Sequence, residues 1–517
     1  MFIVITCVLI ALGLYFHQGQ LAAAAIVAFL GLLALIMDLV GVSLGDLFRR
    51  EARPSKVPEI VLKREYRSGP IDKEEILFRG KEATDRYVNG MSKLLVDRAL
   101  PEIQEIATAK KHVQSDRYSE ADTDAAQAIR HLEGSALTAK DSAVLLSQAY
   151  LIRGDAAFNS KLFAEAENYY THSRTLANLS HDEFLMTASS IGVAIAKGSQ
   201  GKNTEALDIL GQILRSHPDC AEAWYNKGVA LDMLGRPDEA LAAFDGTTKL
   251  RPTWVAAWST KGAMLGKLGR HEEALSALNQ AVKLVPKYAV AWNNIGTALV
   301  ELGRHEQALA AFDQAVSLNP RYAIAWASKG YVLDELGKYI DAVTAYDEAL
   351  KLDPERAVVW NNKGAALSRL GRLDQALAAY EEAIRRRPEY DLAWVNKGLI
   401  FSFQGNHEQA LAAYDEALRI DPKSVEAWVH RGTILVMLRR EQEALSSLRQ
   451  AVRLNPNFAM AWYNRAAVLL KLGRYDEANE AISRALRIDP NDEDAKRLKQ
   501  SIEKKARIRA LRLPKIM

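Results

Sequence analysis

The stretch AEAWYNKGVALDMLGRPDEALAAFDGTTKLRPTW, residues 221–254, decides the fold because its pattern returns every 34 residues. Tryptophan at its fourth position and proline at its thirty-second position recur with the same step. A fixed period of this length is typical of a solenoid, in which each copy is one supersecondary unit stacked on its neighbours. The copies occupy residues 221–254, 255–288, 289–322, 323–356, 357–390, 391–424, 425–458 and 459–492.

Small residues stand at fixed positions within each copy. Position 8 is glycine in seven of the eight copies and Ala466 in the last, and position 20 is always alanine. Two helices approach closely only where a side chain is nearly absent, so we expect positions 8 and 20 to face each other. Glycine at position 15, replaced once by Arg439, suits the end of a first helix, and the proline at position 32 ends a second. Each copy is therefore predicted to be a helix–turn–helix unit.

The first copy shows the whole pattern, in Trp224, Tyr225, Asn226, Lys227, Gly228, Leu231, Gly235, Ala240, Phe244 and Pro252. This order resembles the tetratricopeptide repeat (TPR). The resemblance implies an all-α, right-handed superhelical solenoid with eight regular TPR repeats at residues 221–492. Weaker copies upstream, near 102–135 and 147–180 and from Thr187, indicate degenerate TPR-like repeats over 102–220.

In the family that this sequence resembles, the first helices line a concave groove that binds extended peptides or partner helices. From the third copy onward, positions 2, 5, 6, 9 and 12 are mostly small or apolar, which suits an apolar or neutral segment of a protein partner. Asparagine recurs at position 6, where a row of amides can hydrogen-bond a peptide backbone; the alternative is a role in local packing. The predicted partner-binding residues are Asn226, Asn293, Asn294, Tyr331, Asn361, Asn362, Asn396, Tyr463 and Asn464.

Lysine recurs at position 7, beside the asparagines. Its charge either gives the groove a positive potential, or its stem lies along the helix pair with only the ammonium group in water. We favour the second arrangement. The lysines concerned are Lys227, Lys261, Lys329, Lys363 and Lys397.

The N-terminus has the composition of a membrane anchor. Residues 1–37 contain no Asp, Glu, Lys or Arg, and the polar residues 17–20 divide them into two apolar runs. One helix of that length would greatly exceed the ~30 Å hydrocarbon core, so two transmembrane helices within residues 1–48 are predicted. One alternative is a single span with an interfacial first segment. The other is a cleaved signal peptide, which normally begins with basic residues, but no Lys or Arg precedes Arg49.

Basic segments flank the repeats. Residues 49–67 hold seven Lys/Arg and three Glu, within a linker and amphipathic helix predicted for 49–101, so the positive-inside rule places the repeats in the cytoplasm. Residues 493–517, predicted as a capping helix and tail, hold nine Lys/Arg and three acids. Both segments are candidates for contact with anionic lipid, although a solvated capping helix is the simpler interpretation of the second.

The sequence contains no pattern that indicates nucleic-acid binding, metal binding or catalysis. Lys+Arg is 67 and Asp+Glu is 64, a balance that argues against a nucleic-acid binder. His271, His305 and His407 lie on separate units, too far apart for one metal, and the two cysteines make no metal site. No catalytic motif is present, and the non-repeat segments are too short for a typical catalytic domain, so we expect no cofactor and no enzyme activity.

These observations predict a membrane-anchored scaffold that binds a partner protein or peptide in its concave groove. Two alternatives remain open. The repeats could serve extracytoplasmic assembly or secretion, which residues 49–67 disfavour. The chain could also be a non-catalytic regulatory subunit of a separate enzyme.

Overall fold

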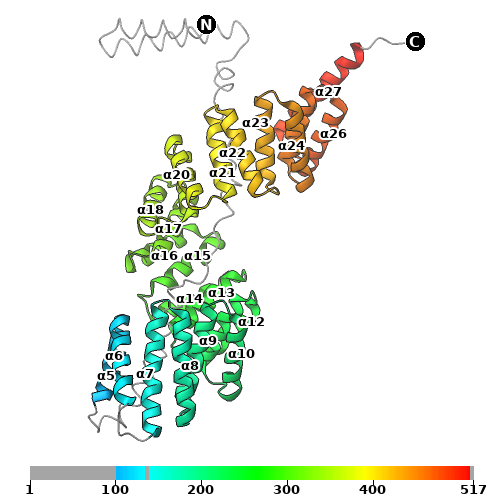
Figure 1. Ribbon diagram of the computed structural model, residues 1–517. Helices are drawn as coiled ribbons and strands as arrows, with labels where there is room; N and C mark the ends of the chain where they lie inside the picture. Colours follow the sequence, from blue (N-terminus) through cyan, green and yellow to red (C-terminus); the bar gives the residue numbers. More distant parts are fainter. Residues whose placement is uncertain (1–100, 134–138, 513–517) are drawn as a thin grey trace, which may run out of the picture. The chain divides into compact units, whose positions relative to one another are not determined.

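The computed structural model describes residues 101–133 and 139–512, and every regular element in these ranges is an α-helix (Figure 1). None of these helices is both long enough and apolar enough to cross a bilayer. The transmembrane hairpin predicted for 1–48 and the linker and helix predicted for 49–101 lie outside the described residues, apart from Pro101, at which the first described helix begins.

Three helix pairs occupy the segment for which degenerate repeats are predicted. Gly154 and Gly192, from two different helices, both lie against the ring of Tyr170, because a Cβ on either would fall 2.5 or 2.6 Å from a ring carbon. Close helix packing therefore continues where tryptophan is lost. The helices are α5 (Pro101–Gln114), α6 (Tyr118–Glu133), α7 (Ala139–Asn159), α8 (Phe163–Ser180), α9 (Glu183–Ser199) and α10 (Asn203–Ser216).

Each regular repeat forms a first helix of 13 residues and a second helix of 14, as the period predicts. The first helices are α11 (Ala221–Met233), α13 (Val255–Lys267), α15 (Ala289–Glu301), α17 (Ala323–Glu335), α19 (Ala357–Arg369), α21 (Asp391–Phe403), α23 (Val425–Met437) and α25 (Ala459–Lys471). The second helices are α12 (Pro237–Leu250), α14 (His271–Leu284), α16 (His305–Leu318), α18 (Tyr339–Leu352), α20 (Leu373–Arg386), α22 (His407–Ile420), α24 (Glu441–Leu454) and α26 (Tyr475–Ile488). A last helix, α27 (Glu493–Arg512), packs on α26.

The turn within each repeat depends on a left-handed residue at position 15. The glycines there have φ between 70° and 77°, a conformation that costs an L-residue about 1–2 kcal/mol. In the first repeat the amide of the next residue, Arg236, then donates to the carbonyl of Leu231 at 2.9 Å, which closes the helix end. Arg439 adopts the same conformation with φ of 58°, so the sequence departure does not change the turn.

The close contact at position 8 differs from the expectation. A Cβ on Gly330 would lie 2.6 Å from a ring carbon of Tyr346, at position 24, and not against the alanine at position 20. The other position-8 glycines likewise face the Phe, Tyr or Leu at position 24 of their own repeat. Because these larger side chains fill the space between the paired helices, position 8 has no room for a side chain. The alanines at position 20 are fully buried, but they are not the nearest neighbours of the glycines.

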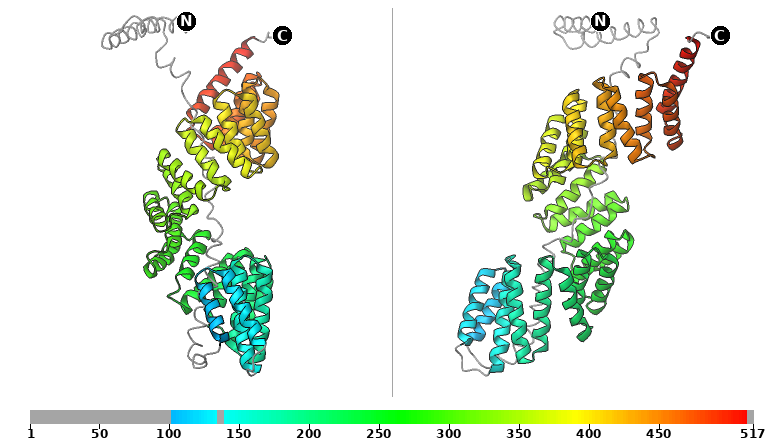
Figure 2. Two further views of the ribbon diagram at one scale, coloured as in Figure 1. Left: turned by 60° about the vertical axis from the view of Figure 1, so that its left-hand side comes forward. Right: turned by 45° about the vertical axis from the view of Figure 1, so that its right-hand side comes forward.

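The helix pairs stack on one another in chain order (Figure 2). The first helices of the regular repeats are together termed the first-helix row; they are α11, α13, α15, α17, α19, α21, α23 and α25. Each helix packs on the next in chain order, and α13 also contacts α15, α17 contacts α19, and α23 contacts α25. No second helix of a regular repeat packs extensively on the second helix of the next within the described residues. This arrangement of paired helices is typical of a TPR superhelix.

Candidate partner-binding surface

The tryptophans at position 4 make one repeated hydrogen bond. In all eight repeats the indole Nε1 donates to the carbonyl oxygen of the proline six residues earlier, at 2.8–3.3 Å. That proline follows the second helix of the preceding repeat, so each tryptophan links its first helix to the turn before it. The matching periods of tryptophan and proline thus have one structural cause.

The position-7 cations lie at the junctions between repeats. Lys363 Nζ lies 5.0 Å from the ring centroid of Trp360 and 2.6 Å from Asp347, at position 25 of the preceding repeat. The ring face attracts the ammonium group and the carboxylate neutralises it. Equivalent pairs join Lys261 to Asp245, Lys329 to Asp313, Lys397 to Glu381 and Arg431 to Asp415. These paired charges do not supply free positive potential to a groove.

Several position-6 side chains bond to position 5 of the preceding repeat. Asn396 Nδ2 donates to Asn361 Oδ1 at 2.9 Å, and both residues are buried, with 5% and 1% of their surface exposed. Asn294 Nδ2 donates to Ser259 Oγ at 3.5 Å. Hydrogen bonds of this kind join neighbouring first helices, which supports the packing interpretation of these asparagines.

The remaining predicted site residues lie at the surface of the first-helix row to different degrees. Asn293 is buried, whereas Asn226, Asn294, Asn362 and Asn464 are partly exposed. Asn226 Nδ2 donates to the carbonyl oxygen of Glu222 at 2.8 Å within its own helix, and Asn464 Nδ2 donates to Thr433 Oγ1 at 3.4 Å in the preceding repeat. Tyr331 and Tyr463 are partly exposed on α17 and α25. A role for these residues in binding a partner stays a prediction.

Exposed apolar side chains add to this surface. At position 13, the last residue of the first helix, Met233 is 61% exposed, Met437 is 59% exposed and Phe403 is 41% exposed. Sequence reasoning missed them, although other repeats carry Lys, Glu or Arg at this position and the apolar exceptions were visible. Phe403 and Met437 lie on successive first helices, α21 and α23, whereas Met233 lies on α11.

Ion pairs also cross the first-helix row. Asp334 Oδ2 accepts from Arg369 Nη1 at 2.5 Å, between position 12 of one repeat and position 13 of the next. Burial raises the pKa of the Asp334 carboxyl above its usual value, although Arg369 acts in the opposite direction. Lys267 and Asp232 form the same kind of pair at 2.5 Å. These pairs fix neighbouring first helices side by side.

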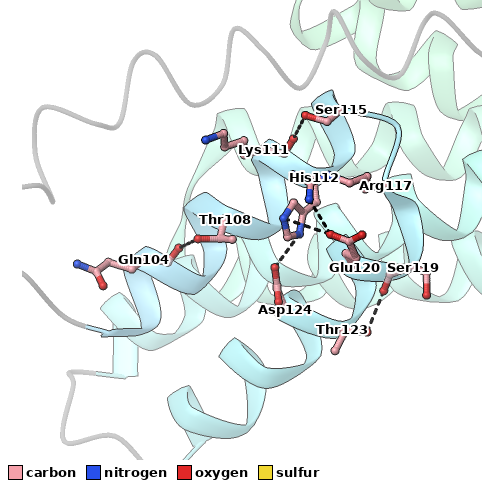
Figure 3. Close-up of polar contacts among 10 residues, drawn as sticks. All are labelled: Gln104, Thr108, Lys111, His112, Ser115, Arg117, Ser119, Glu120, Thr123 and Asp124. Atoms are coloured by element: carbon pink, nitrogen blue, oxygen red, sulfur yellow. Dashed lines mark hydrogen bonds and ion pairs between the residues drawn. The ribbon is translucent and has the colours of Figure 1, made fainter.

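The polar cluster in Figure 3 lies between α5 and α6. His112 Nδ1 lies 2.9 Å from Asp124 Oδ2 and its Nε2 lies 3.5 Å from Glu120 Oε2, which joins the two helices. No group of three His, Cys, Asp or Glu side chains in the described ranges could hold a metal ion.

Family models described as "Tetratricopeptide repeat" match this chain. One matches residues 194–253, 293–357, 361–425, 401–457 and 431–493, and another matches residues 255–321. No curated protein matches the chain.

Similar solved structures include "Crystal structure of APC/C hetero-tetramer Cut9-Hcn1" (16% identity, 84% of this chain and 96% of that chain, TM-score 0.42). Another is "Crystal structure of YrrB: a TPR protein with an unusual peptide-binding site" (23% identity, 36% of this chain and 95% of that chain, TM-score 0.31). A third is pilF of Pseudomonas aeruginosa (21% identity, 42% of this chain and 96% of that chain, TM-score 0.37). Since the family models together span more than half of its residues, the chain belongs to the tetratricopeptide repeat family.

Proposed function

We propose that this protein is a membrane-tethered scaffold, which holds an extended segment of a partner protein along the first-helix row. TPR proteins serve as protein–protein interaction scaffolds and are generally non-catalytic. The proposal adds two points to that general role. It assigns the binding surface to the first-helix row, and it assigns residues 1–48 to a membrane anchor.

One observation carries the first point, namely the mixture of side chains along the row. Partly exposed apolar residues at position 2, such as Val290, Val358 and Leu392, recur on successive repeats. Exposed Met233 and Met437 extend this apolar character. Apolar side chains at regular intervals suit an extended segment that is itself apolar, while the accessible amides suit its backbone.

The second point rests on the sequence. Residues 1–37 lack charged side chains, and a basic segment follows at 49–67. An anchor of this kind holds the repeats close to a membrane and raises their effective concentration toward partners in the same membrane. By the positive-inside rule, the repeats then face the cytoplasm.

Deleting residues 1–48 is expected to move the protein from the membrane pellet to the soluble fraction. The reason is that the repeats expose no span of their own, within the described residues, that could enter a bilayer. The measurement is carbonate-washed membrane fractionation of the full chain and of the deletion variant, quantified by immunoblotting.

A matched control removes residues 513–517 instead, which shortens the chain at the basic tail and leaves residues 1–48 in place. This control is expected to remain in the pellet. A deletion variant that still pelleted with washed membranes as fully as the full chain would show that the anchor lies elsewhere.

A further inference from the structure

Most junctions between regular repeats pair a cation with a carboxylate at fixed positions, a pattern that is termed the charge rule. A cation at position 7 stacks on the tryptophan of its own helix and pairs with a carboxylate at position 25 of the preceding repeat. Five junctions form this pair, with N–O distances of 2.6–3.0 Å. Where position 25 is the neutral Asn279, position 7 is the neutral Ile295. The two positions therefore vary together within this one chain.

The last junction breaks the rule. Position 25 is Arg449 on α24, and position 7 is Arg465 on α25, so a second cation replaces the carboxylate. Arg465 keeps its usual place, with its guanidinium carbon 5.3 Å from the ring centroid of Trp462. Its Nε is buried and has no hydrogen-bond partner in the described chain. Burial and the neighbouring Arg449 together lower the pKa of Arg465.

A second arginine lies over the same tryptophan as Arg465. The guanidinium carbon of Arg484, on α26, lies 6.0 Å from the ring centroid of Trp462. Arg449 and Arg484 are exposed, and within the described residues none of the three arginines forms an ion pair with a carboxylate. Two carboxylates of α26, Glu480 and Glu477, act on Arg465 electrostatically without forming an ion pair with it, and Glu477 is paired with Arg474 at 2.6 Å. Arg465 and Arg484 thus lie over one indole, with Arg449 acting on Arg465, and in the described chain this junction lacks the paired carboxylate that five other junctions contain.

We propose that Arg449, Arg465 and Arg484 form a binding site for a carboxylate side chain of an acidic partner segment. The partner's Asp or Glu pairs with these guanidinium groups, as Asp415 pairs with Arg431 one repeat earlier. A carboxylate fits because the same cation-on-indole arrangement binds one at five other junctions, and because guanidinium groups bind carboxylates in a bidentate manner. This site goes beyond the first-helix row, since two of its three arginines lie on the second helices α24 and α26.

Arg449→Asp restores the rule and is expected to abolish the site while it stabilises the fold. The full chain in detergent micelles is titrated against a fluorescein-labelled hexapeptide of alternating Asp and Glu, with fluorescence anisotropy as the readout. We expect the acidic peptide to bind, its Asn/Gln counterpart to bind at least about tenfold more weakly, and Arg449→Asp to weaken acidic-peptide binding by about tenfold or more.

Arg487→Asp is the matched control. Arg487 is exposed on α26, three residues after Arg484, forms no ion pair in the described chain and undergoes the same change of charge. It is expected to change the affinity by less than about threefold, because it lies outside the junction. Equal loss in both variants would reduce the effect to general charge attraction and overturn the site, as would equal binding of the acidic and amide peptides.

Thermal unfolding provides an independent readout. Arg449→Asp is expected to raise the unfolding midpoint by about 1–3 °C, because the new carboxylate relieves repulsion and pairs with Arg465. An unchanged or lower midpoint would contradict the charge rule on which the site rests. Phosphatidylserine vesicles serve as a competing probe. If Arg449→Asp abolished vesicle binding while the acidic peptide never bound, the peptide site would be overturned in favour of a lipid site.

Discussion

Gly330→Ala is expected to destabilise the repeat stack by about 2 kcal/mol. A Cβ at this position would lie 2.6 Å from Tyr346, closer than any real carbon contact, so the ring or the helix has to shift. Overpacking of this kind costs about 1–3 kcal/mol, from which the better helix propensity of alanine recovers up to about 1 kcal/mol. The measurement is urea unfolding followed by circular dichroism at 222 nm.

Gly266→Ala is the matched control for this prediction. Gly266 also lies inside a first helix, but a Cβ there would meet no atom within 4 Å. The same substitution should therefore stabilise the protein, by up to about 1 kcal/mol. If the free energy of unfolding falls in Gly330→Ala and rises in Gly266→Ala, close contact at Gly330 is the cause. If both variants gained stability, the contact between Gly330 and Tyr346 would not limit packing.

The last repeat shows how the chain itself accommodates alanine at position 8. Ala466 stands there, and position 24 is Ile482, so a β-branched side chain replaces the ring; both residues are fully buried. The double variant Gly330→Ala with Tyr346→Ile should consequently lose less stability than the sum of the two single variants.

Acidification from pH 7 to pH 5 is expected to cost about 2 kcal/mol of stability through His430 alone. Burial lowers the pKa of His430 from its usual value to about 4, and its ring stacks on Tyr414 with 5.6 Å between centroids. Between pH 6.5 and 4 the unfolded chain then binds the proton more readily than the folded chain. This contribution to stability is complete above pH 6.5 and is lost as the pH falls toward 4.

His430→Asn isolates this effect, because asparagine occupies position 6 in five other repeats. Urea unfolding of both proteins at pH 7 and pH 5 gives the comparison. The variant is expected to lose about 2 kcal/mol less than the wild type over this interval. An identical loss in both proteins would assign the acid sensitivity to other groups.

The repeat pattern was sufficient to predict which residues form helices and where they end. The glycines at position 15 have positive φ, and the tryptophans recur at equivalent places, as their spacing indicates. Period and residue type determine these features because they depend on one turn or on residues six apart in the chain.

Contacts between helices were harder to predict. Position 8 faces position 24 and not position 20, since the nearest atom depends on how two helices cross and not only on where small residues stand. The hydrogen bond between Asn361 and Asn396 joins two repeats and was equally hard to predict. The sequence alone does not show which positions of neighbouring first helices lie opposite each other. The junction pairs, such as Lys363 with Asp347, depend on the same arrangement of neighbouring repeats.

The sequence predicted only part of the candidate partner-binding surface, again because it does not reveal contacts between repeats. The sequence predicted the first helices as the binding surface, which stays a prediction, and it selected their amides, some of which bond across repeats instead. It overlooked exposed Met233 and Met437, because a single apolar residue at a helix end departs from the consensus without forming a motif.

Photo-crosslinking in native membranes tests the proposed binding surface most directly. Benzoylphenylalanine is placed at Tyr331, on first helix α17, or at Thr344, on second helix α18 of the same repeat. Tyr331 is partly exposed and Thr344 is exposed, so both positions can carry the probe. A scaffold that binds along its first helices should give a discrete crosslinked partner from Tyr331 and none from Thr344. Crosslinking from Thr344 alone, or equally from both positions, would contradict it.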